Sequence, residues 1–74
     1  MGKSFNSKQE LIDFIYKQCN VVLNNESGVL GECDGLLYTR IPQACLNSVL
    51  SVLNKYGIQH NEHLHNKYWI YLNN

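Results

Sequence analysis

The sequence carries little charge and no excess of either sign. Lysine and arginine together number six, aspartate and glutamate also number six, and charged residues make up 16% of the chain. Nucleic-acid binding through phosphates needs a basic face, and a chain with this balance has no surplus of positive charge to build one. The same balance excludes an acidic mimic of DNA. We therefore expect no nucleic-acid partner held mainly by charge.

Long apolar runs are also missing. No stretch approaches the roughly 20 residues of a membrane-spanning helix, and the first seven residues lack the apolar segment of a secretory signal. The three cysteines, Cys19, Cys33 and Cys45, are odd in number and widely spaced, which does not fit a disulfide framework. We predict reduced, mostly buried thiols in a cytoplasmic protein with no membrane partner.

Motifs of catalysis and cofactor binding are absent from the sequence as well. It contains no Ser-His-Asp pattern, no phosphate-binding glycine loop and no paired-carboxylate motif. Cys45 falls in the first turn of an expected helix, a position that can activate a thiol, but no histidine stands at a defined spacing from it. We predict a protein that is not an enzyme, with no catalytic residue and no cofactor.

The chain does contain enough apolar residues for one small core. Hydrophobic residues form 45% of the 74 positions, which is normal for a globular protein and too high for disorder. A chain of this length buries only about 60% of the surface that its unfolded form exposes. We expect residues 1–74 to form a single compact domain.

Two helices are predicted from capping residues and apolar spacing. Ser7 and Glu10 form a capping box at the start of a helix over residues 7–19. Pro42 and Gly57 mark the two ends of the second helix. The second helix presents one apolar face, made of Leu46, Val49, Leu50 and Leu53.

Strands are predicted between and after these helices. The β-branched segment 20–24 fits a strand or a frayed helix end, and we predict a strand. The dipeptide Asp34-Gly35 favours a type I′ hairpin, and a second hairpin is expected from residues 58–61 and 68–72. The predicted fold is α+β, in the order α-β-β-β-α-β-β, with an antiparallel sheet of four to five strands and both helices packed on one face.

Aromatic side chains on these strands are the candidate binding residues. Tyrosine, tryptophan and arginine dominate binding hot spots because they bury a large area and keep a polar group. Two helices can cover only one face of a sheet, so aromatic residues on the other face would meet a target or a second subunit. The alternative is that half of them belong to the core. The predicted partner-binding residues are Tyr38, Arg40, Trp69 and Tyr71.

Three histidines form the one cluster that resembles a metal site, namely His60, His63 and His65. On a strand, His63 and His65 would share a face and His60 would point away. Glu62 is the only adjacent acid, and no cysteine completes a ligand set. We interpret the segment as a polar hairpin connection and keep metal binding by the three histidines as an alternative.

These features favour a small interaction protein that binds a larger host protein or protein complex and inhibits it sterically. In size, neutrality and lack of catalytic groups, the chain resembles the small inhibitors carried by phages and mobile elements, including anti-CRISPR and other anti-defence proteins. The resemblance implies a rigid sheet or helix face that blocks a substrate channel or an assembly surface. The alternatives are a homodimer formed through the aromatic residues and a single-stranded nucleic-acid-binding module that stacks bases on them.

Overall fold

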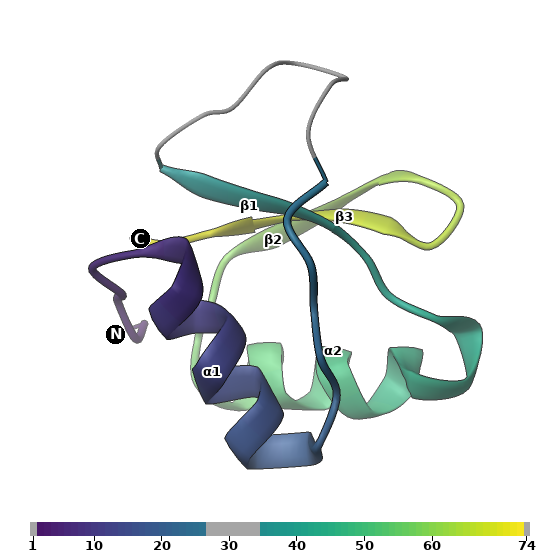
Figure 1. Cartoon of the computed structure of the whole chain (residues 1–74), viewed down its shortest axis with the longest axis horizontal. Coiled ribbons are helices and arrows are strands. Elements are labelled where there is room, and N and C mark those ends of the chain that lie inside the picture. Colours follow the sequence, from purple (N-terminus) through teal and green to yellow (C-terminus); the bar gives the residue numbers. More distant parts are fainter. Residues whose placement is uncertain (1, 27–34, 74) are drawn as a thin grey trace.

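Two helices lie on one side of a three-stranded antiparallel sheet in the computed structural model of the chain (Figure 1). The structure describes residues 2–26 and 35–73. The strand order is β1-β3-β2, so β3 is the central strand. The elements, in chain order, are α1 (Lys8–Cys19), β1 (Leu36–Arg40), the 3₁₀ turn η1 (Gln43–Cys45), α2 (Leu46–Lys55), β2 (His60–Leu64) and β3 (Lys67–Tyr71). The predicted α+β class is confirmed.

The predicted count of four to five strands is wrong, since the described residues form three strands in the order α-β-α-β-β. Segment 20–24 is not a strand. Asn20 ends α1 with a positive φ of 61°, and the chain after it joins no ladder, although Leu23 is buried in the core. The apolar pattern of this segment therefore reflects packing and not strand pairing. The Asp34-Gly35 hairpin prediction, with its strand before Asp34, lies outside the described residues.

The first helix has the N-cap that the sequence predicts. Ser7 has an extended backbone, and its hydroxyl accepts a hydrogen bond from the Glu10 amide at 3.1 Å. The Glu10 carboxylate accepts from the amide of Asn6 at 3.5 Å, one residue before the position that a full capping box uses. The helix start is thus set by local side-chain chemistry, and Leu11 and Ile15 on its inner face are 0% exposed.

The second helix begins later than predicted and ends where predicted. Pro42 has an extended backbone, with ψ of 143°, and a 3₁₀ turn separates it from the α-helix, which begins at Leu46. At the other end Gly57 has a φ of 64°. The amide of Ile58 donates to the carbonyl of Leu53 at 2.8 Å, which is the longer-range hydrogen bond of a Schellman motif.

The core lies between the two helices and the sheet face that they cover. The two helices, β1, β3 and the segments that follow α1 and β1 contribute the fully enclosed side chains. These are Leu11, Ile15, Leu23, Leu37, Thr39, Ile41, Val49, Leu53 and Ile70. In the predicted face of α2, Val49 and Leu53 are fully buried and Leu46 and Leu50 are half-buried. Neither described helix is long and apolar enough to cross a bilayer.

The strand register assigns each side chain to one of two sheet faces. Leu37 and Thr39 of β1 pair with Ile70 and Tyr68 of β3, and these four residues are buried on the helix side. The alternate positions point the opposite way. We call this second side the outer face, and the register places on it Leu36, Tyr38, Arg40, Asn61, Leu64, Lys67, Trp69 and Tyr71.

Tyr68 should make the fold less stable at alkaline pH. Burial raises the pKa of its phenol, and the Glu62 carboxylate raises it further. In the unfolded chain the Tyr68 phenol ionises at its ordinary pKa near 10. The contribution of the neutral phenol to the free energy of unfolding is therefore complete below about pH 10 and is lost as the pH rises above it. We expect Tyr68→Phe to flatten this fall in urea-unfolding measurements. Tyr16→Phe, at a side chain that is 51% exposed, should keep the wild-type slope, and equal slopes in both variants would contradict the assignment.

Candidate functional site

Tyr38, His63 and Trp69 form a connected aromatic cluster on the outer face. Tyr38 pairs with Trp69 across β1 and β3, with ring centroids 6.4 Å apart. His63 of β2 stacks on Trp69, with centroids 5.2 Å apart and 28° between the ring planes. The Tyr38 hydroxyl and His63 Nδ1 are hydrogen-bonded at 2.9 Å, which links the two outer strands across the central one. The three rings are therefore held in a fixed arrangement.

A β-bulge in β2 accompanies the entry of His63 into this cluster. Glu62 pairs with Tyr68 and Leu64 pairs with Lys67, so two steps along β2 match one step along β3. A bulge of this kind bends the strand and re-aims its side chains. No residue in the segment predicts a bulge. Sequence reasoning assigned His63 to a polar hairpin connection, with metal binding as the alternative, and missed its place beside the aromatic residues.

The two cations of the outer face have different partners. Lys67 Nζ lies 2.8 Å from the Glu26 carboxylate and 5.9 Å from the centroid of the Tyr38 ring. The Glu26 amide also donates to the Tyr38 carbonyl at 2.7 Å, which fixes this acid beside β1. Arg40 sits opposite Lys67 in the register, is exposed, and forms no ion pair within the described part of the chain. Arg40 is thus the cation of this face whose charge is not offset there.

The four predicted binding residues share the outer face but are unequally accessible. Arg40 is exposed, and Trp69 and Tyr71 are half-buried. Tyr38 is only 7% exposed, because the rings of His63 and Trp69 lie against it. Tyr38 therefore lies beneath the other rings. The accessible residues among the four predicted ones are Arg40, Trp69 and Tyr71, and the exposed His63 lies beside them.

The three histidines of the metal alternative are not gathered at one point. His60 pairs with Ile70 of the inner face, and its Nδ1 donates to the Ile58 carbonyl at 2.8 Å. His63 belongs to the outer aromatic cluster, and His65 lies in the turn between β2 and β3. Within residues 2–26 and 35–73, no group of three or more metal-binding side chains occurs. The metal alternative therefore has no preformed site in this part of the chain.

Two of the three cysteines can be placed. Cys19 and Cys45 are half-buried free thiols, and Cys33 lies outside the described residues. The Cys19 thiol donates to the Ile15 carbonyl at 3.3 Å, and burial raises its pKa. A raised pKa keeps a thiol protonated and weakly nucleophilic. Cys19 thus behaves as a small packing residue.

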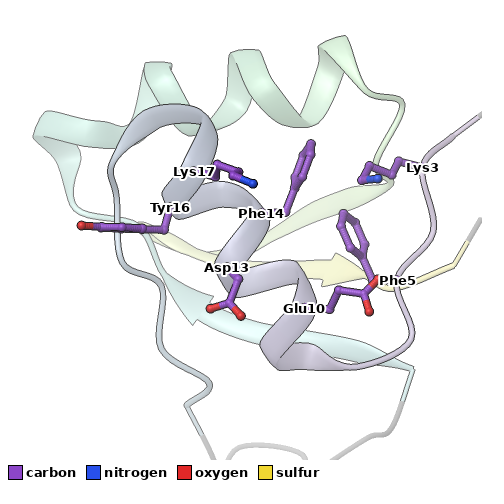
Figure 2. Close-up of a pocket in the computed structure, with 7 residues that line it drawn as sticks. All are labelled: Lys3, Phe5, Glu10, Asp13, Phe14, Tyr16 and Lys17. Atoms are coloured by element: carbon purple, nitrogen blue, oxygen red, sulfur yellow. The ribbon is translucent and has the colours of Figure 1, made fainter.

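A hollow on the helix side of the molecule lies between α1 and the segment that precedes it (Figure 2). Its wall includes Phe5 and Phe14, whose ring centroids are 5.4 Å apart, and Lys3 Nζ lies 4.9 Å from the Phe14 centroid. Phe14 also packs edge-on against Tyr56 at 4.9 Å. Because these rings pack on one another, we interpret the hollow as the seam that joins the N-terminal segment to the two helices.

Comparisons with known proteins assign this chain to no family. No family model matches the sequence, and no curated protein and no solved structure shows significant similarity to it. The function is therefore argued from the geometry of the outer face.

Proposed function

We propose that this chain is a non-enzymatic binding protein that docks the outer face of its sheet on a larger protein and blocks that protein sterically. The observation that supports the proposal is that Arg40, Trp69 and Tyr71 share the sheet face that neither helix covers (Figure 1). These three residue types are the ones most enriched among binding hot spots. Core packing does not require their presence together on that face.

The arrangement of the cluster before binding also supports this proposal. The Trp69 ring already stacks on His63 and lies against Tyr38. Ordering a mobile side chain at an interface costs about 0.5–1.5 kcal/mol, and a ring held in place avoids much of that cost. A small surface gains most from such preorganisation because it has few contacts with which to offset the entropy.

The charges of the outer face favour a different protein over a second copy of the chain. A two-fold dimer places the same patch of both subunits against itself. Glu26 offsets the charge of Lys67 at 2.8 Å, and Arg40 has no acidic partner among the described residues. The only acid of the three described strands, Glu62, pairs with Tyr68 of the inner face. A dimer formed through the outer face would therefore give Arg40 no unpaired acid from these strands, whereas a different protein can supply a carboxylate.

Inhibition by occupancy fits a chain of this size. A 74-residue protein with no catalytic motif can act on a larger protein by covering a channel or an assembly surface. This is the mode of action of the small inhibitors of phages and mobile elements, and an anti-defence inhibitor is the functional class that we propose for this chain.

The test compares two aromatic variants in capture from an extract of the source organism. Trp69→Ala should weaken capture of the target by about 2 kcal/mol or more, which is roughly a 30-fold rise in Kd. Tyr16→Ala removes an aromatic ring that is 51% exposed on α1, which is not part of the outer face, and should leave capture unchanged. Circular dichroism on both variants confirms that each remains folded.

Two results would overturn the proposal. In the first, folded Trp69→Ala captures the same protein as fully as wild type. In the second, sedimentation shows that the wild-type chain is a dimer and that Trp69→Ala is a monomer. The second result would assign the outer face to self-association.

A further inference from the structure

The outer face is too small to be a standard protein interface by itself. Each of its three strands has five residues, which corresponds to a sheet about 17 Å long and roughly 10 Å between its outer strands. The flat area is therefore on the order of 200 Å², whereas a standard interface buries about 800 Å² on each partner. A face of this size matches a short segment, such as a loop or the end of a chain.

The charge on this face indicates which side chains such a segment should carry. Lys67 is already paired with Glu26 at 2.8 Å, and Arg40 is exposed without an acidic partner in the described residues. A guanidinium group binds a carboxylate through two parallel hydrogen bonds, which gives both strength and direction. Arg40 is therefore the position on the outer face where a carboxylate of the partner gains most.

An apolar contact lies next to that position. Arg40 pairs with Lys67, and Trp69 follows two residues later on the same face of β3. Diagonal neighbours of this kind in a sheet are about 7–8 Å apart, which is within reach of long side chains. A bound segment can thus place a carboxylate on Arg40 and a neighbouring apolar side chain against Trp69.

A nucleic-acid strand fits this surface less well than an acidic peptide. Tight binding through phosphates uses about 6–10 cationic contacts, and Arg40 is the one cation of the described outer face whose charge is not offset. Base stacking needs an open ring face. His63 already stacks on Trp69 at 5.2 Å and covers one face of the indole.

We infer that the outer face binds a short acidic segment of a protein, with a carboxylate held by Arg40 and a neighbouring apolar side chain packed on Trp69. The inference rests on the proposed function, because it names the part of the partner that the proposed surface meets. It adds the chemical class of that part, which the proposed function leaves open.

The experiment selects binders from a random dodecapeptide library on the immobilised wild-type chain. The selected peptides should be enriched in aspartate or glutamate beside an apolar residue. In fluorescence polarisation with a selected peptide, Arg40→Gln should raise the Kd about tenfold or more, as expected for the loss of a hydrogen bond to a charged group. Lys17→Gln removes the same charge from an exposed position on α1 and should leave the Kd unchanged. Circular dichroism confirms that Arg40→Gln is folded.

Four outcomes would overturn the inference. The library yields no binder, the selected peptides are neutral or basic, or Arg40→Gln binds them as tightly as wild type does. Binding of oligothymidylate at physiological salt that is lost in Trp69→Ala would also overturn it, and would assign the face to nucleic acid.

The two proposals fail in distinguishable ways. If capture of the cellular target is lost in Trp69→Ala and kept in Arg40→Gln, the proposed function stands and the acidic-segment inference is wrong. If capture is kept in folded Trp69→Ala, the proposed function is wrong, whatever the peptide library shows.

Discussion

Leu53→Ala is expected to lower the free energy of unfolding by about 2–5 kcal/mol, the range for truncating a fully buried leucine. The Leu53 side chain is 0% exposed and lies in the core cluster with residues of both helices and the sheet. A chain of this length has a total stability of roughly 4–11 kcal/mol, so the loss is a large fraction of it. Chemical denaturation followed by circular dichroism measures the change.

Leu64→Ala provides the matched control for this prediction. It removes the same atoms from a leucine that is 56% exposed at the end of β2. Its free energy of unfolding should stay within about 0.5 kcal/mol of the wild-type value. Similar losses in the two variants would mean that the face of α2 centred on Leu53 does not form the core.

The second large effect is expected at Asn66, in the turn that joins β2 to β3. Asn66 has a φ of 61°, is only 6% exposed, and its carbonyl accepts a hydrogen bond from the Ile41 amide at 2.8 Å. Asparagine adopts this left-handed conformation readily, whereas a β-branched residue there is strained. Asn66→Val should therefore lower the free energy of unfolding by about 2 kcal/mol, at the upper end of the cost of a left-handed residue.

Asn66→Gly separates backbone strain from the loss of the side chain. Glycine adopts a positive φ without steric cost, so this variant should lose less than half as much stability as Asn66→Val. If the two variants lose the same amount, the asparagine side chain and not the backbone conformation stabilises the turn. Thermal melts of the two variants and wild type, under one buffer condition, make the comparison.

The features that the sequence predicts correctly depend on neighbouring residues. The N-cap at Ser7 involves residues within one helical turn of it, and the cap at Gly57 joins Leu53 to Ile58. Such interactions can be predicted from the residues next to the cap. The error at segment 20–24 has the opposite origin, because whether an extended chain pairs with a strand depends on what lies beside it in the fold.

The candidate site likewise has a part that local sequence predicts and a part that depends on contacts between distant residues. Strand alternation alone predicts that Trp69 and Tyr71 share one face of β3 and that Tyr38 and Arg40 share one face of β1. Bringing the two pairs together requires the register of β1 against β3, in which Tyr38 meets Trp69, and this is a contact between residues far apart in the sequence. Each face of β1 and β3 carries apolar or aromatic residues, and polar residues occur on both, with Thr39 on the inner face and Arg40 and Lys67 on the outer face. The pattern therefore could not tell which face the helices cover.

The position of His63 is the hardest feature to foresee. Strand alternation puts His63 on the same face as Asn61, but its neighbours there depend on how β2 pairs with β3, and a polar strand such as β2 specifies its register weakly. The result becomes visible only through the stacking on Trp69 and the hydrogen bond to Tyr38. Sequence reasoning therefore identifies the aromatic residues and leaves out the imidazole that orders them.

The alternation along β1 and β3 has a consequence for how this protein can evolve. Leu37 and Ile70 are enclosed by the core, while Arg40 and Trp69 lie on the opposite face of the same strands. Under the proposed function, substitutions at the second set would change what the surface binds, while the first set continues to specify the fold. Adaptation to a partner that alters its own surface can therefore proceed through single changes at alternate positions, without a compensating change in the interior.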